Sequence, residues 1–534
     1  MTKKLLLNLL CAILIVFSVN AQSINNSFFE KVKYIGAFGS TDWTAGWANF
    51  DPINTNYGTP TSTLGNSDKT VAGGLKITTN TSISGIVKLD GWVYIKSGAK
   101  LTIAAGTIVR GTPASCLVIE PGAQIIAEGT SSNPIVFTSM NGAGNRGPSD
   151  WGGLIICGNA QINSPSKRII EGGVGTEYGG ANGDTANNNE SSGILKYVRI
   201  EFAGYDVDGK GNEINGLTMG GVGRGTTIDY VQVSYSGDDA FEWFGGTVNC
   251  KHLIAYHNED DDFDTDYGYQ GLVQFAVTLR DTGTFDTDKS RAFESDNDAN
   301  SSNNKPYTSP VFSNVSAFGP YIELSTPQNP SSTLEAALYL RRNSRIQIYN
   351  SVFAGWKYGL IIDGSGSQSA AIHDSLKIYN CIFAGMKTNF DIKGGTMTKN
   401  DLKNWFMESS RQNDTLVTNN LLLLNNPFNY TNPNFLPKEN SPVLVKSTWK
   451  DIVNYVEKTN ISDGITIYPN PADNFIYINY NDVLKVTISN INGYMLKTIE
   501  AENKISVSDL PKGMYLLNIL TSNGNTYNKK FIKK

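Results

Sequence analysis

The sequence is poor in charge and in histidine. Asp, Glu, Lys and Arg make up 17% of its 534 residues, and it contains three histidines. The formal net charge is −5, and no basic stripe with interleaved aromatic residues occurs, which argues against a nucleic-acid partner. The five cysteines form no CxxC pair, so a structural zinc site is not expected. What the chain has in abundance is glycine, 53 residues, which together with the low charge favours an all-β protein rich in turns.

The N-terminus has the pattern of an export signal. Lys3 and Lys4 precede a short apolar run over residues 5–19, and Val19 and Ala21 supply the small residues of a cleavage site. A membrane anchor, the alternative, needs about 20 apolar residues, more than this run or any later segment offers. We therefore expect residues 1–21 to be a signal peptide for Sec export, with no transmembrane segment after its removal.

Four cysteines remain in the expected mature chain: Cys116, Cys157, Cys250 and Cys381. An exported protein can form disulfides, but these residues are far apart and the sequence does not determine a pairing. Small buried free thiols are the commoner alternative.

The C-terminal region, residues 465–534, predicts a small antiparallel β-sandwich, because short apolar strands alternate with turn dipeptides such as Asn492-Gly493 and Lys512-Gly513. Four motifs in order carry a resemblance: Tyr468-Pro469-Asn470-Pro471-Ala472, Ile488-Ser489-Asn490-Ile491-Asn492-Gly493, Leu510-Pro511-Lys512-Gly513-Met514-Tyr515 and Lys529-Lys530-Phe531. The region resembles the type A C-terminal sorting domain of the type IX (Por) secretion system of Bacteroidetes-type bacteria. An ordinary fibronectin-like module is the alternative.

The resemblance implies a route and partners. The sandwich would be recognised by the type IX secretion machinery and removed by its sortase-like protease. The product would be released or attached to surface lipopolysaccharide. We therefore expect the protein outside the cell or on the outer-membrane surface.

Internal repeats indicate the fold of the middle of the chain. Residues 346–357 and 376–387 match closely, and residues 93–130 contain very short strands punctuated by glycine turns, as a solenoid requires. Residues 121–139 resemble the opening coils of right-handed parallel β-helix proteins of the pectate-lyase-like superfamily. A β-propeller, the alternative, would show longer blade repeats.

We therefore predict an all-β chain: a right-handed parallel β-helix solenoid followed by a small C-terminal β-sandwich sorting domain. The expected divisions are a signal peptide (1–21), an N-terminal cover over the open edge of the solenoid (22–70), the β-helix with its C-terminal cover (71–455), a linker (456–464) and the sorting domain (465–534).

One stretch of the solenoid is unusually acidic. Residues 239–244, 261–266 and 291–296 align, which predicts that Phe241, Phe263 and Phe293 stack inward while the following acids stack outward. Coils lie about 4.8 Å apart, and at an effective dielectric of 20 two carboxylates at that distance repel by about 3 kcal/mol. A hard cation such as Ca²⁺ would relieve this repulsion. The expected metal ligands are Glu242, Asp264, Asp266, Glu294 and Asp296.

Two alternatives stay open at this stretch. The acids are either solvated surface charges, partly offset by nearby arginines, or part of an active site. Gly237-Asp238-Asp239 is similar to the paired aspartates of polygalacturonase-type glycoside hydrolases, but the accompanying Gly-His-Gly and Arg-Ile-Lys motifs are absent. A polysaccharide lyase would need a base, for which Lys251, Arg280 and Arg291 are candidates.

We favour a non-enzymatic function: a secreted or cell-surface β-helix protein that binds glycans or builds the surface, with Ca²⁺ as its cofactor. The alternative is a polysaccharide lyase or glycoside hydrolase acting near residues 238–296, with Asp238, Asp239, Arg280 and Arg291 as candidate catalytic residues.

Overall fold

A computed structural model describes residues 24–180, 186–207, 212–287, 289–322, 330–444, 447–449, 466–480, 482–490, 495–500, 502–521 and 526–534. The chain divides into two compact units, Met1–Asp451 and Ile452–Lys534. The predicted signal peptide and linker lie outside the described residues, so they stay predictions. In the part that is described, no helix has both the length and the apolar character needed to span a bilayer.

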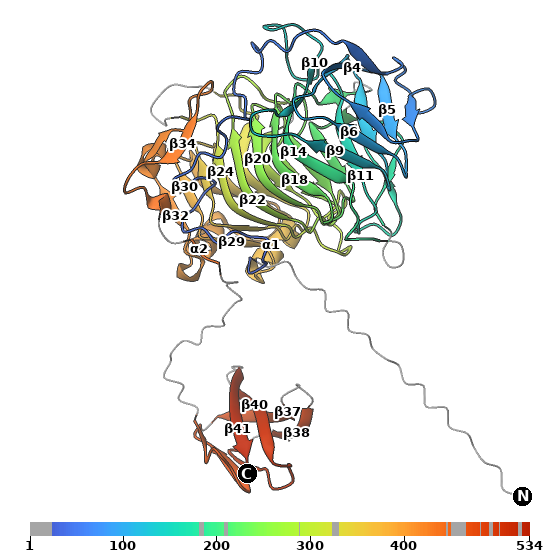
Figure 1. Ribbon diagram of the computed structural model, residues 1–534. Coiled ribbons are helices and arrows are strands. Elements are labelled where there is room, and N and C mark those ends of the chain that lie inside the picture. The colour runs from blue at the N-terminus through green and yellow to red at the C-terminus, as the bar shows by residue number, and fades with distance from the viewer. Residues whose placement is uncertain are drawn as a thin grey trace, which may run out of the picture. The chain divides into compact units, whose positions relative to one another are not determined.

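The first unit is a parallel β-helix, as predicted, whose short strands stack coil upon coil (Figure 1). Within the described residues, one sheet has 17 strands. They are β1 (Ser62–Gly65), β3 (Thr81–Ile83), β4 (Ile86–Asp90), β6 (Lys100–Ile103), β7 (Ile108–Gly111), β9 (Gln124–Glu128), β10 (Ile135–Ser139), β14 (Gly193–Glu201), β18 (Thr227–Ser234), β20 (Asn249–Tyr256), β22 (Leu272–Leu279), β24 (Val311–Phe318), β26 (Gln347–Tyr349), β27 (Val352–Ala354), β29 (Lys377–Tyr379), β30 (Ile382–Ala384) and β32 (Asp414–Leu416).

A second parallel sheet has 11 strands. They are β2 (Leu75–Ile77), β5 (Trp92–Ile95), β8 (Cys116–Ile119), β11 (Gly153–Cys157), β17 (Leu217–Gly220), β19 (Phe241–Phe244), β21 (Phe263–Asp266), β23 (Ser290–Ser295), β25 (Leu334–Leu340), β28 (Tyr358–Asp363) and β31 (Thr388–Lys393). The unit also contains helices α1 (Gly364–Ile372) and α2 (Lys399–Phe406), the 3₁₀ turns η1 (Ser409–Arg411), η2 (Asn419–Leu422) and η3 (Pro442–Leu444), and three hairpins, β12 (Arg168–Ile169) with β13 (Glu177–Tyr178), β15 (Tyr205–Asp206) with β16 (Glu213–Ile214), and β33 (Leu424–Asn426) with β34 (Asn434–Pro437).

The core forms because the same inward position on successive coils is apolar. Val198, Val231, Leu253, Ala276 and Val315 pair in register across β14, β18, β20, β22 and β24, and all are fully buried. Such stacking excludes water from the inside of the solenoid and is its main source of stability.

The repeats detected in the sequence occupy equivalent positions on neighbouring coils. Ile348 pairs with Ile378, and Phe353 pairs with Phe383. Cys116, Cys157, Cys250 and Cys381 are buried free thiols, so they pack as small core residues and form no disulfides with one another.

Strand β1 of the N-terminal segment pairs with β4 at the N-terminal edge of the solenoid. The part of the segment that precedes β1 lies against a different surface. It runs along the outside of the 17-stranded sheet, where Asn49, Glu30 and Ala37 donate backbone N–H groups to Gln232, Gln274 and Ser316, on β18, β22 and β24 respectively. Its tryptophan Trp47 is 1% exposed. The aromatic residues of this segment therefore cover a face of the solenoid. At the other end, α2 buries Leu402 and Phe406 against the last coils.

The second unit has two antiparallel sheets, as predicted for the sorting domain. One contains β35 (Ile467–Tyr468), β36 (Phe475–Ile478) and β39 (Lys504–Ser506); the other contains β38 (Met495–Glu500), β37 (Val483–Asn490), β40 (Gly513–Thr521) and β41 (Thr526–Lys533). Buried side chains from both sheets, including Ile476, Ile488 and Phe531, form its core.

Candidate functional site

The acidic residues form a column on the outer face of the 11-stranded sheet. Glu242 on β19 pairs with Asp264 on β21, which pairs with Glu294 on β23, in the predicted register. The neighbouring phenylalanines point the other way and stack inside: the Phe241 and Phe263 ring centroids are 5.7 Å apart. The alternation of a β-strand thus separates an aromatic ladder from an acidic one.

The column is covered, although it lies on the outer face of the sheet. Glu242 is 7% and Glu294 is 5% exposed. The hairpin of β12 and β13 brings Glu171 over the column, and the Asn215 amide donates to both Glu171 (2.6 Å) and Glu242 (2.5 Å). The interpretation of these acids as solvated surface charges therefore does not fit, since long inter-strand loops fold back over them.

The structure separates the predicted metal ligands into two groups. Asp296 accepts from Arg341 Nε (2.8 Å) and Arg342 Nη1 (2.7 Å). Glu294 pairs with Arg291 Nη1 (2.5 Å) and also contacts Arg341. These two acids therefore have guanidinium counter-charges, which makes them the weaker cation ligands.

Arg341 and Arg342 belong to the site, although neither was among the residues expected from the sequence. Both follow β25, which pairs with β23 as the next coil of the solenoid. Extending the alignment of the acidic strands by one coil would have placed the two arginines beside the column.

Of the other three predicted ligands, Glu242 and Asp264 form a tight group with Asp239, whereas Asp266 lies outside it. Asp239, Glu242 and Asp264 each offer an oxygen, and these three atoms lie within 4.8 Å of one another. Asp264 Oδ1 is buried and, among the described residues, has no hydrogen-bond partner. Asp239 was considered above only as a catalytic candidate, and the structure places it with the predicted metal ligands. We call Asp239, Glu242 and Asp264 the acidic trio.

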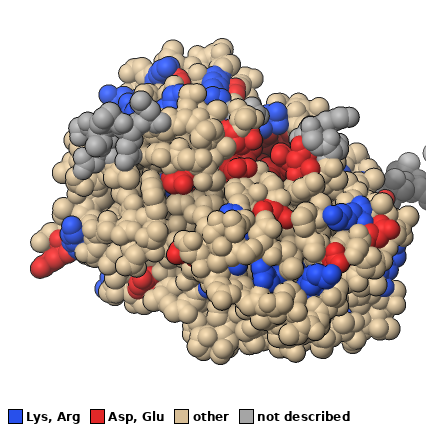
Figure 2. Space-filling view, turned by 90° about the horizontal axis from the view of Figure 1, so that it is seen from above, with Lys and Arg blue, Asp and Glu red and all other residues tan. Residues whose placement is uncertain are grey.

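A second group adjoins the first. Oxygens of Asp238, Asp239 and Asp260 also lie within 4.8 Å of one another, and Asp260 Oδ1 is likewise buried without a partner in the described chain. Asp239 therefore links both groups. Acidic side chains gather in one hollowed patch of the face drawn in Figure 2.

Burial and mutual repulsion set the electrostatics of the site. Burial, followed by the charge of Asp238, raises the pKa of Asp239 well above its usual value. Burial, followed by the charge of Glu294, does the same to the pKa of Asp264. Burial and Asp296 raise the pKa of Asp266 to about 8. Such carboxyls must either retain protons near neutral pH or be neutralised by a cation.

The two arginines proposed as bases are not placed to take a proton. Arg280 is fully buried, lies 3.2 Å from Asp262, and donates to the backbone carbonyls of Asn258 and Glu259. Arg291 is surrounded by Asp261, Glu294 and Glu335, whose charges raise its pKa against the opposing effect of burial. Both guanidinium groups hold the local structure together.

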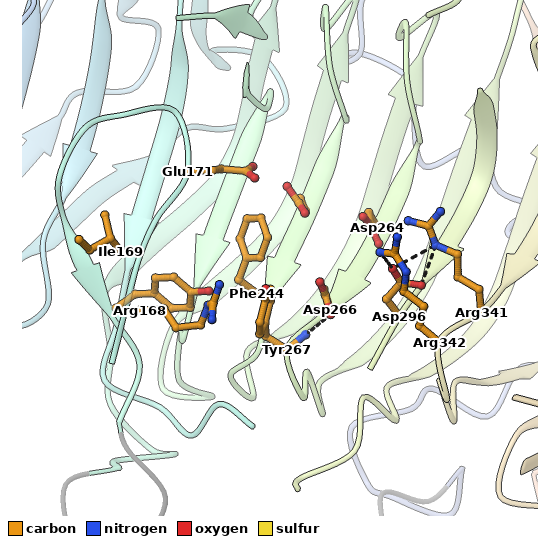
Figure 3. Close-up of a pocket in the computed structure, with 12 residues that line it drawn as sticks. Arg168, Ile169, Glu171, Phe244, Asp264, Asp266, Tyr267, Asp296, Arg341 and Arg342 are labelled. Atoms are coloured by element: carbon orange, nitrogen blue, oxygen red, sulfur yellow. Dashed lines mark hydrogen bonds and ion pairs between the residues drawn. The ribbon is translucent and has the colours of Figure 1, made fainter. Parts of the chain in front are cut away.

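Two cavities open over the column. One of about 220 Å³ is lined mostly by carboxylates, including the acidic trio. The other, of about 300 Å³, is shown in Figure 3: Arg168 and Ile169 of β12 lie on one side, Arg341 and Arg342 on the other, with Phe244, Asp266 and Tyr267 between them. Glu171, Glu242, Asp264 and Arg341 line both cavities.

Comparison with known proteins agrees with this architecture. Residues 75–420 match the family model described as a pectate-lyase like beta helix domain, and residues 466–534 match that of a secretion system C-terminal sorting domain. A beta-agarase D from Zobellia galactanivorans is 32% identical over 72 residues, which cover 13% of this chain and 15% of that protein. The shared stretch is thus a small part of either protein.

Proposed function

Since the chain belongs to the pectate-lyase-like β-helix family and carries a sorting domain that directs it through the type IX secretion system to the cell surface or beyond, we propose that it is a calcium-dependent glycan-binding protein. The cation would be held by the acidic trio, and glycan would bind in the cavities above the column.

The observation that carries this proposal is that one carboxylate oxygen each of Asp239, Glu242 and Asp264 lie within 4.8 Å of one another, and that Asp264 Oδ1 is buried without a hydrogen-bond partner among the described residues. Three carboxylates in so small a volume repel strongly unless a positive charge lies between them. Calcium accepts six to eight oxygen ligands in flexible geometry, which suits side chains on two adjacent strands and a loop. Magnesium demands near-octahedral geometry and loses its water reluctantly, so it fits this group less well.

A specific observation supports glycoside hydrolysis as a second candidate. Asp238, Asp239 and Asp260 lie close together, and burial with neighbouring negative charge raises the pKa values of all three. A protonated carboxyl beside an ionised one is the arrangement that glycoside hydrolases use. A lyase is less favoured, because all three of its candidate bases, Lys251, Arg280 and Arg291, lie in ion pairs.

The proposal is tested by calorimetric titration of the full chain, freed of metal, with CaCl₂ and separately with MgCl₂. We expect calcium to bind with a dissociation constant on the order of 10⁻⁴ to 10⁻³ M, the range of extracellular modules, and magnesium to bind more weakly. A glycan panel with and without chelator then measures both binding and bond cleavage. Absence of calcium binding would remove the cation site.

The hydrolase candidate has its own outcome. Newly formed reducing ends would indicate hydrolysis, and an Asp238→Asn variant should abolish them while it retains calcium binding, because Asp238 is outside the acidic trio. Binding without cleavage on every glycan tested would leave the binding function alone.

A further inference from the structure

The cavity beside Arg168 continues into another of different chemistry. This next cavity, of about 460 Å³, shares Arg168 and Tyr267 with the 300 Å³ cavity over the acidic column. Its other walls carry amide and hydroxyl groups in place of the acidic column, with Asp298 as the one carboxylate among the residues that line it. We call it the amide cavity.

Hydrogen bonds fix the walls of the amide cavity. Asn163 is 1% exposed, and its Nδ2 donates to the backbone carbonyl of Asn297 at 2.6 Å. The Asn297 amide in turn donates to the carbonyls of Ser302 and Asn304. Asp298 Oδ1 accepts from the backbone N–H groups of Asn300 and Ser302 at 2.9 and 3.0 Å. The loop is therefore built, and its shape does not depend on a ligand.

One polar atom of the wall residues lacks a hydrogen bond within the described part of the chain. Asn163 Oδ1 is buried and has no hydrogen-bond donor among the described residues. An unsatisfied buried acceptor is destabilising, and a donor from an ordered water removes that cost. That oxygen is enclosed by the protein, so the amide groups open to a ligand are instead those of the exposed Asn300 and Asn304.

Arg168 and Tyr267 form the partition between the two cavities. The Arg168 guanidinium lies over the Tyr267 ring, 4.1 Å from its centroid, and Phe244 packs 6.1 Å from that ring on the side of the column. Stacking holds the guanidinium in one orientation. Arg168 lines both cavities, and Figure 3 shows it beside the cavity over the acidic column. A ligand that crosses the partition would accept hydrogen bonds from Arg168.

The mixture of groups in the amide cavity identifies a class of ligand. Its lining carries both donors and acceptors, and its two charged residues, Arg168 and Asp298, have opposite sign. Pro165, Ala299 and Tyr267 add small apolar surfaces. A neutral sugar residue has this complementary pattern, because each hydroxyl both donates and accepts and the ring carbons present apolar patches.

We propose that the amide cavity binds a neutral sugar residue of a glycan chain, and that the next part of the chain passes Arg168 into the cavity over the acidic column. The second half of this statement rests on the proposed function, whereas the first half does not. The ligand is thus an extended polysaccharide that binds at two chemically different subsites.

The test uses the full chain and two matched substitutions. Ala299 is an exposed residue that lines the amide cavity, so Ala299→Trp should fill it without disturbing the core. Ala143 is exposed and lines neither of these two cavities, so Ala143→Trp is the control. Asn300→Ala removes one polar wall group and leaves the space open. The probes are neutral glucan, galactan and mannan hexasaccharides and a polygalacturonate hexasaccharide, each titrated with calcium and with chelator.

We expect at least one neutral hexasaccharide to bind the wild type, Ala299→Trp to weaken that binding about tenfold or more, and Ala143→Trp to leave it unchanged. Asn300→Ala should weaken it less. Equal binding by Ala299→Trp and wild type, at equal melting temperatures, would overturn the proposal, as would binding of the charged hexasaccharide alone.

These outcomes are separate from those of the proposed function. If calcium does not bind but Ala299→Trp still abolishes neutral-glycan binding, the cation site fails and the amide cavity stands. If calcium binds and neutral glycans do not, the amide cavity fails and the cation site stands.

Discussion

Replacing Asp264 with Asn tests the acidic trio most directly. Asp264 lies on the central strand of the column, and its Oδ1 is the buried oxygen without a partner. Asn keeps the shape of the side chain and removes one negative charge. The substitution should therefore weaken calcium binding and, at the same time, stabilise the metal-free protein.

The size of both effects follows from the geometry. Two carboxylates 4.8 Å apart repel by about 3.5 kcal/mol at an effective dielectric of 20, and Asp264 has two such neighbours. Because the raised pKa values keep these groups partly protonated, we expect Asn to stabilise the metal-free protein by about 2 kcal/mol at pH 8. Calcium at 100 times its dissociation constant should stabilise the wild type by about 2.7 kcal/mol.

Thermal unfolding converts these values into measurable shifts. At about 2.1 cal/mol/K per residue, the unit that ends at Asp451 has an unfolding entropy of about 0.9 kcal/mol/K. Calcium should therefore raise the wild-type melting temperature by about 3 °C, and Asp264→Asn should melt about 2 °C above the wild type in chelator. The calcium shift of the variant should nearly vanish.

Two control substitutions make the test specific. Asp266 follows Asp264 by two residues on the same strand but lies outside the acidic trio, so Asp266→Asn should retain most of the calcium shift. Asp414 is exposed on β32, so Asp414→Asn should change neither value. An unmoved wild-type melting temperature in calcium, together with no gain for Asp264→Asn in chelator, would refute the reasoning about the trio. An equal loss of the calcium shift in Asp266→Asn would show that the cation lies elsewhere in the column.

Three further predictions concern the whole chain. The folded-state pKa values of these carboxyls lie above the unfolded ones, and that of Asp266 is raised to about 8. Their contribution to the stability of the fold is therefore fully present below about pH 4 and is lost as the pH rises through 8. The metal-free protein should therefore melt at a lower temperature at pH 8.5 than at pH 5 in a melting series, and calcium should flatten this slope. Ile378 is fully buried against Ile348 of the next coil, so Ile378→Asp should lower the free energy of unfolding by several kcal/mol in denaturant titrations, whereas unchanged stability would contradict the strand phase. Deletion of residues 465–534 should leave a folded β-helix that fractionates with the periplasm, and its normal appearance at the cell surface would count against the sorting role of the second unit.

Local patterns in the sequence were sufficient for the architecture. The matching segments at residues 346–357 and 376–387 predicted coils that stack in register, and the aligned Phe-Glu and Phe-Asp pairs predicted both an inner aromatic ladder and an outer acidic one. Both predictions are confirmed by the strand pairings. The sequence is sufficient here because each coil of a solenoid packs on the coils before and after it. The spatial neighbours of a residue are therefore the equivalent residues of the adjacent repeats.

The site needed the tertiary structure, because its decisive contacts come from outside the repeat. Glu171 reaches the column from a hairpin about 70 positions before Glu242 in the chain, and no periodicity links them. The burial that raises the carboxyl pKa values is produced by such loops. The pairing of Arg341 and Arg342 with Asp296 likewise depends on how the coil after a long insertion returns to the sheet.

The sequence by itself therefore determined the export address, the β-helix and the register of its strands, all of which follow from motifs or from a repeat of fixed period. Only the tertiary structure decided which of the acids are neutralised by arginine and which are left together as the acidic trio. The physical reason is that a strand register fixes a column of side chains, whereas the charge and water content around that column depend on loops whose folding obeys no repeat.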